Sequence, residues 1–162
     1  MPKYTISEFQ NEIAARLGVD ISKDSFDVAA ARILDRVALA VRQLPQRQAS
    51  MAQKEFAKSL RLSVAKDSMR VASAKISDAL HAKNIKALKR LNLRKDDKVV
   101  YTEKYETPQG AQVHTTEHVV SSIGANGRVY FKGIGCPGAW PSQLKRAKAN
   151  NSSKPTPLRG AA

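Results

Sequence analysis

The stretch GANGRVYFK at residues 124–132 decides the fold class of the last third of the chain. Its Asn126-Gly127 pair supplies the positive φ angles that a tight hairpin turn needs, and the residues that follow are typical of a strand. Two more segments rich in Val, Thr and Tyr precede it at 98–106 and 112–122, separated by a Pro-Gln-Gly turn at 108–110. The pattern predicts a small antiparallel module of three to five short strands.

Glycine and proline are distributed unevenly along the chain. Only Pro2, Gly18 and Pro45 fall in the first 107 residues, and the other twelve fall in the last 55. Because both residues interrupt helices, the split predicts an α+β protein with a helical region at 1–95, a β module at 96–148 and a flexible basic tail at 149–162. The helical region divides into a helix pair at 1–45 and basic helices at 46–95.

Local signals place the helices within this region. We expect Thr5 and Glu8 to form a capping box at the start of the first helix, and Gly18 to end that helix. The second helix should begin near Asp24 or Ser25. A long helix or two abutting helices should occupy 46–80, followed by a short helix capped by Asn84. No internal repeat is evident in the sequence.

The 162 residues carry a formal net charge of +14, from 28 basic residues against 14 acidic ones. The excess is concentrated at 51–100, where 13 basic residues face 5 acidic ones. Such a charge indicates a polyanionic partner. No apolar run approaches the ~18 residues of a membrane-spanning helix. The single cysteine, Cys136, cannot form an internal disulfide, so we expect a cytoplasmic protein.

Two sets of side chains are candidates for nucleic-acid contact. The basic set, expected to neutralise phosphates, consists of Lys54, Lys58, Arg61, Lys83, Lys86, Lys89, Arg90, Arg94, Lys95, Arg128, Lys132, Lys145, Arg146 and Lys148. The aromatic set, on whose rings bases could stack, consists of Tyr101, Tyr105, Tyr130 and Trp140. For Trp140 a place in the core of the β module is the favoured alternative.

The end of the β module resembles a known family. Gly127-Arg128-Val129-Tyr130-Phe131, followed by the sequence WPSQLK at 140–145, is similar to the end of the C-terminal domain of retroviral and retrotransposon integrases. The resemblance covers about a third of the chain and implies an SH3-like β-barrel, a kind of module that often contacts DNA or a partner protein. Nothing upstream resembles an integrase catalytic core.

The sequence offers no convincing catalytic or metal site. His114 and His118 match a zinc-peptidase pattern, H-x-x-E-H, that requires a helix. The Val and Thr residues around them favour a strand, which would hold the two imidazoles about 13 Å apart. Cys136 has no base beside it, and no glycine-rich phosphate loop is present. We therefore expect no enzyme activity, no metal and no cofactor.

The leading functional hypothesis is non-enzymatic nucleic-acid binding, with DNA favoured over RNA. Asp24 and Asp27 at the start of the second helix would repel phosphates, so the helix pair is expected to mediate packing or homo-oligomerisation through its apolar faces. One alternative is a phage- or plasmid-type protein that docks on an acidic host or capsid protein. A second alternative is an RNA- or ribosome-associated factor.

Overall fold

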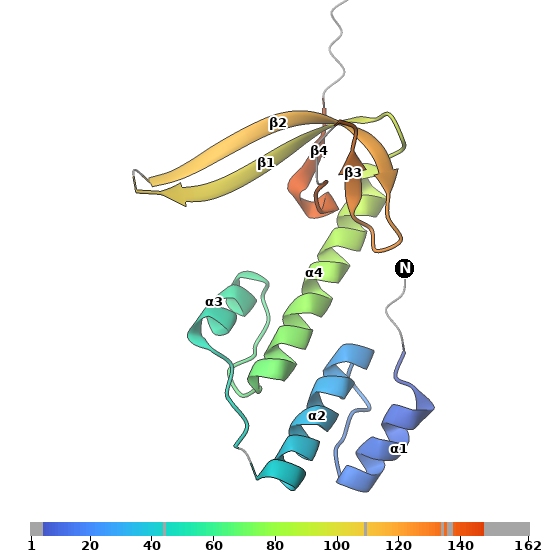
Figure 1. The fold of residues 1–162 in the computed structure, drawn as a ribbon, viewed down its shortest axis with the longest axis vertical. Coiled ribbons are helices and arrows are strands. Elements are labelled where there is room, and N and C mark those ends of the chain that lie inside the picture. Colours follow the sequence, from blue (N-terminus) through green and yellow to red (C-terminus); the bar gives the residue numbers. More distant parts are fainter. Residues whose placement is uncertain (1–4, 44, 109, 134, 136–137, 148–162) are drawn as a thin grey trace, which may run out of the picture. The chain divides into compact units, whose positions relative to one another are not determined.

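The computed structural model describes residues 5–43, 45–108, 110–133, 135 and 138–147. The helices are α1 (Glu8–Leu17), α2 (Phe26–Arg42), α3 (Met51–Ser59) and α4 (Met69–Leu91) (Figure 1). They are followed by β1 (Lys98–Thr107), β2 (Gly110–Ile123), β3 (Val129–Phe131), the 3₁₀ helix η1 (Pro141–Gln143) and β4 (Leu144–Arg146). The predicted α+β class is confirmed.

The chain forms two compact units, Met1–Ala87 and Leu88–Ala162. The division falls inside α4 because the last turn of that helix belongs to the core of the sheet. Leu88 and Leu91 pack against the buried residues of the β module. We call the first part the helical unit and the second part the sheet unit.

Serine caps set the starts of the helices. Ser7, not Thr5, caps α1, and its hydroxyl accepts a hydrogen bond from the Gln10 amide at 3.2 Å. The Gln10 side chain accepts in return from the Ser7 amide at 3.0 Å, which completes a capping box two residues after the predicted one. Gly18 ends α1 in the left-handed conformation, as predicted, and Ser25 caps α2, the second of the two starts considered.

The second half of the helical unit differs from the prediction. The helices α3 and α4 do not abut, since residues 60–68 form a connection in which Arg61 has a φ of 60°. Asn84 does not cap a separate helix. It is buried inside α4, which continues for 23 residues because no glycine or proline interrupts it.

The helical unit contains two copies of one helix hairpin. The first helices of the two hairpins begin at Glu8 and Met51 and the second helices at Phe26 and Met69, so both pairs are offset by 43 residues. The sequence KDSFDVAAARILD at 23–35 matches KDSMRVASAKISD at 66–78 in eight of thirteen positions. The expectation that the chain has no internal repeat is therefore wrong. We call residues 5–43 repeat 1 and residues 48–86 repeat 2.

The two repeats bind each other through equivalent residues. The Ser25 hydroxyl donates to Asp78, and the equivalent Ser68 hydroxyl donates to Asp35. Because the contacts run from the start of each helix to a point ten residues along the other, α2 and α4 are antiparallel. Between them lies a cluster of four equivalent apolar residues, namely Val28, Ala31, Val71 and Ala74. Such reciprocity is the pattern of an isologous interface.

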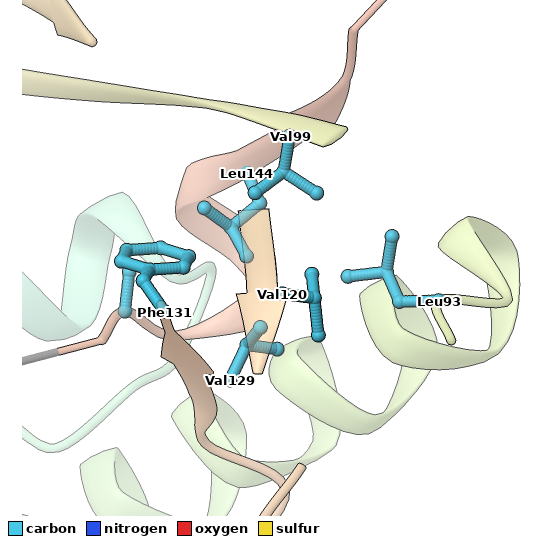
Figure 2. Packing of buried hydrophobic residues seen from close by; sticks show 7 residues of the cluster. Leu93, Val99, Val120, Val129, Phe131 and Leu144 are labelled. Carbon is cyan, nitrogen blue, oxygen red and sulfur yellow. The ribbon is translucent and has the colours of Figure 1, made fainter. Parts of the chain in front are cut away.

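The sheet unit is a four-stranded antiparallel sheet in the order β3-β2-β1-β4. Its core combines Val99, Val120, Val129, Phe131 and Leu144 with Leu93 from the turn after α4 (Figure 2). The sheet is open, so the predicted closure into an SH3-like barrel is wrong. Three-residue strands at the two edges, β3 and β4, are too short to reach each other around the core.

The long hairpin of β1 and β2 extends beyond the rest of the sheet (Figure 1). The strand β4 pairs only with Val99–Tyr101, and β3 pairs only with Val120–Ile123. The part of the hairpin from Thr102 to Thr115 is therefore a two-stranded ribbon. The turn predicted at 108–110 connects the two strands, although Gln109 lies outside the described residues.

Candidate nucleic-acid interface

The turn between α4 and β1 is fixed to the sheet by its own backbone. Leu93 is buried in the core of the sheet unit, while Asn92 and Asp96 adopt positive φ angles of 43° and 74°. The Asp96 amide donates to the Val120 carbonyl at 2.9 Å, and the Val120 amide donates to the Asp97 carbonyl at 2.9 Å. Two backbone hydrogen bonds therefore join this irregular turn to β2, as they would join a paired strand.

Five exposed cations line this rigid connection. Lys89 and Arg90 lie in the last turn of α4, Arg94 and Lys95 in the turn itself, and Lys98 at the start of β1. None of them forms an ion pair with any residue that the structure describes. We call residues 89–98 the basic segment. Lys98 was not among the predicted cations, although its position in the sequence, close to the other four, could have identified it.

Two other predicted cations are paired with the acids of the same turn. Lys132 forms an ion pair with Asp96, and Arg146 forms one with Asp97 at 2.6 Å. The Lys132 ammonium group lowers the pKa of Asp96. Hydrogen bonds from the Arg94 amide and then from the Arg146 guanidinium lower the pKa of Asp97. Lys132 and Arg146 thus hold the turn in place, with much of their charge compensated locally.

Lys98 and Lys145 share the outer face of the sheet. In the pairing of β1 with β4, Val100 lies opposite Lys145, so the side chains of Lys98, Val100 and Lys145 all point away from the core. Glu117 lies opposite Val100 on β2 and therefore occupies the same face. The outer face therefore carries Lys98 on β1 and Lys145 on β4, with Glu117 on β2, the strand adjacent to β1.

Apart from Arg128 of the sheet unit, the remaining predicted cations with described positions are on the helical unit, all in repeat 2. Lys58 and Arg61 are exposed at the end of α3, and Lys54 is half-buried one helical turn earlier. Lys83 and Lys86 are exposed on α4. Repeat 2 carries eight basic and three acidic residues, whereas repeat 1 carries five basic and six acidic residues. The two copies of the hairpin therefore differ sharply in charge.

The aromatic candidates are divided between core and surface. Tyr101 is half-buried, with its ring centroid 6.5 Å from that of Phe131 in the core. Tyr105, Tyr130 and Trp140 are exposed. Arg128 lies over the Trp140 ring, 5.9 Å from its centroid, and donates to the Gly138 carbonyl at 3.3 Å. This guanidinium orders the loop before β4, and one face of Trp140 is already covered by it.

The two histidines of the zinc-like pattern lie on β2, in the predicted strand conformation. His118 stacks on Phe131 with ring centroids 4.3 Å apart, and its Nε2 is 2.9 Å from the Thr116 hydroxyl. Within the described part of the chain no group of three His, Cys, Asp or Glu side chains is arranged to hold a metal ion. Cys136 and Lys148 lie outside the described residues.

No helix among the described residues is both long enough and apolar enough to span a membrane.

In comparisons with protein-family models, curated proteins and solved structures, nothing matches this chain. The resemblance to integrase C-terminal domains therefore stays a prediction.

Proposed function

We propose that this protein is a non-enzymatic nucleic-acid-binding protein of the cytoplasm that neutralises phosphates, with DNA as the favoured ligand. The observation that carries the proposal is the basic segment, in which five exposed cations without ion pairs to described residues follow one another on a rigid connection. Cations on a fixed backbone lose less conformational entropy on binding than cations on a chain that must first be ordered.

The distribution of acids supports the same conclusion. The two acids inside the basic segment, Asp96 and Asp97, are engaged by Lys132 and Arg146. Their negative charge is thereby offset by side chains that come from outside the segment. A phosphate that approaches Arg94 or Lys95 therefore meets little opposing charge.

Repeat 2 also carries an excess of basic residues, which gives the helical unit cations of its own for contact with a polyanion. Lys83 and Lys86 precede Lys89 and Arg90 on the same helix at spacings of three and four residues. Residues at these spacings are neighbours on a helix surface. All four side chains are exposed.

The salt dependence of binding tests the proposal. Affinity of the nuclease-treated protein for a duplex should fall steeply between about 50 and about 200 mM salt, because each neutralised phosphate releases counterions. Competition with single strands and structured RNA then ranks the ligands. A salt-independent affinity, or no binding to any nucleic acid at low salt, would refute the proposal.

Charge-removing variants locate the surface. The double variant Arg94→Ala and Lys95→Ala should lower the slope of log affinity against log salt by up to about 1.8, at ~0.9 for each lost phosphate contact. Lys23→Ala is the matched control, since Lys23 is equally exposed but lies in the near-neutral repeat 1. Equal effects of the two changes would place the binding surface elsewhere.

A further inference from the structure

The second half of α2 carries an exposed apolar face. Leu34, Val37 and Val41 are 55%, 37% and 75% exposed. They are separated by three and four residues and so lie on one side of the helix. The remaining residues of that side, Ala30 and Ala38, are also uncharged. An apolar face of this kind on a surface helix marks an interaction site.

Repeat 2 shows that the fold does not require this face. At an offset of 43 residues, Leu34 corresponds to the exposed Ser77, and Val41 corresponds to the buried Asn84, whereas Val37 corresponds to the half-buried Leu80. The same hairpin forms with polar residues at the first two of these positions. The apolar residues at positions 34 and 41 are therefore a property of repeat 1 and not of the hairpin.

The place of this face in the repeat pair explains why it is uncovered. Asp35 of α2 contacts Ser68 at the start of α4. The two helices are antiparallel. The part of α2 after Asp35 therefore extends beyond the first residue of α4 and is not covered by that helix. The equivalent part of α4 leads on to Leu88 and Leu91, which are covered by the sheet core.

The charge of the chain indicates which partner covers the apolar face of α2. A second copy carries +14, so most approaches between two copies are repulsive. Repeat 1 is the exception, because its five basic residues are outnumbered by six acidic ones. An acidic partner would instead be drawn to repeat 2 and the basic segment. The face on α2 thus suits a second copy of this chain better than a polyanionic protein.

We propose that the protein is a homodimer in which the Leu34–Val37–Val41 face of α2 packs against the same face of a second copy. The contact would be isologous, like the contact between α2 and α4 inside each chain. It uses no residue of the basic segment, which belongs to the other unit.

Sedimentation of the nuclease-treated full chain at high salt tests this dimer. The wild-type protein should sediment as a dimer at micromolar concentrations. Leu34→Glu should raise the dissociation constant more than ~100-fold, because the contact would bury two unpaired carboxylates. Ser77→Glu, the same change at the equivalent exposed position of repeat 2, should leave the dimer intact.

Each outcome decides the proposal. A wild-type chain that is monomeric throughout, or a dimer that persists in Leu34→Glu, would overturn it. Because Leu34 is more than half exposed, the variant should fold, which circular dichroism checks. If it does not, Leu34→Ser places the residue of repeat 2 at the same position, and the dimer should again weaken. Nucleic-acid binding can fail independently, since sedimentation is measured without ligand.

Discussion

Ser25 and Ser68 each perform two tasks with a single hydroxyl group. The Ser68 hydroxyl accepts a hydrogen bond from the Val71 amide at 3.2 Å, which caps α4, and donates its proton to Asp35. Asp35 is buried and also forms an ion pair with Arg70 at 3.1 Å. The start of one helix is thereby tied to the middle of the other. Ser25 makes the equivalent link to Asp78.

Ser68→Ala should destabilise the helical unit by about 2–3 kcal/mol. The change removes a helix cap, worth ~1 kcal/mol, and also deprives a buried carboxylate of one donor, at a further cost of ~1–2 kcal/mol. Urea unfolding followed by circular dichroism measures the loss. Ser63→Ala, at an exposed position of the preceding connection, should change stability by less than ~0.5 kcal/mol. Equal effects would show that the Ser68–Asp35 link contributes nothing.

Asp97 should titrate below the ordinary aspartate pKa of 3.8, because it accepts hydrogen bonds from the Arg94 amide and the Arg146 guanidinium. Carboxyl NMR across a pH series measures this. Arg146→Ala should raise the pKa of Asp97 toward 3.8, whereas Lys145→Ala, its neighbour on the other face of β4, should not. A pKa that is the same in all three proteins would contradict the ion pair.

The same shift fixes the direction of a pH effect on stability. A carboxyl group whose pKa is lower in the folded state stabilises the fold above its unfolded pKa. That contribution is lost as the pH falls below about 3.8 and through the folded pKa. The turn that carries Arg94 and Lys95 should therefore loosen in acid, and Asp97→Asn should remove this component of the pH dependence.

At the scale of helices and strands, local signals in the sequence were most informative where backbone geometry is special. Gly18, the helix start near Ser25 and the turn at Gly127 were predictable because a left-handed residue, a helix cap and a hairpin turn each need particular side chains. Gly127 has the expected positive φ of 82°, whereas Asn126, expected to share it, does not. The break expected at Asn84 was wrong because a single polar residue does not end a helix. The predicted barrel closure was wrong because closure depends on strand length and on pairing between distant strands. No short stretch of sequence determines either of these.

The repeat was hard to see in the sequence for a physical reason. Its two copies agree at caps, buried contacts and ion pairs, such as Asp24 with Arg32 and Asp67 with Lys75. The two copies carry different residues at exposed positions. These positions determine most of the charge and hydropathy pattern by which a repeat would be noticed in the sequence. The matching triplets Lys23-Asp24-Ser25 and Lys66-Asp67-Ser68 were the available signal.

Gly138→Ala should destabilise the sheet unit by more than ~2 kcal/mol. Gly138 has a φ of 78°, where an alanine costs ~1–2 kcal/mol, and its added Cβ would lie 2.3 Å from the Val129 carbonyl oxygen. That carbonyl accepts from the Ala139 amide at 2.8 Å, so the clash falls on the bridge that holds this loop to β3. Thermal unfolding followed by Trp140 fluorescence measures the effect.

Gly135→Ala separates backbone strain from the clash. Gly135 has a similar φ of 76°, but a Cβ added there would have no described atom within 4 Å beyond its own chain neighbours. Its substitution should cost only the ~1–2 kcal/mol of the left-handed conformation. If both variants lose the same stability, the close approach of Gly138 to β3 is not what requires glycine there.

For the molecule as a whole, the two repeats are one hairpin adapted to two tasks under the functions proposed above. Repeat 1 lacks an excess of basic residues and exposes Leu34, Val37 and Val41. Repeat 2 has eight basic residues against three acidic ones and leads into the basic segment. Self-association and phosphate neutralisation therefore use different surfaces of the chain, and their effects on affinity can be separated.

This separation predicts that DNA length decides whether dimerisation matters. On a duplex long enough for both protomers, the second copy binds at a high effective concentration, so the wild-type protein should bind ~10²-fold more tightly than Leu34→Glu. On a duplex of about one helical turn, ~10 base pairs, only one protomer can engage, and the two proteins should bind alike. Fluorescence anisotropy with both duplexes at one salt concentration measures the ratio. Equal affinities on the long duplex would mean that the paired basic segments do not act together, even if the dimer itself exists.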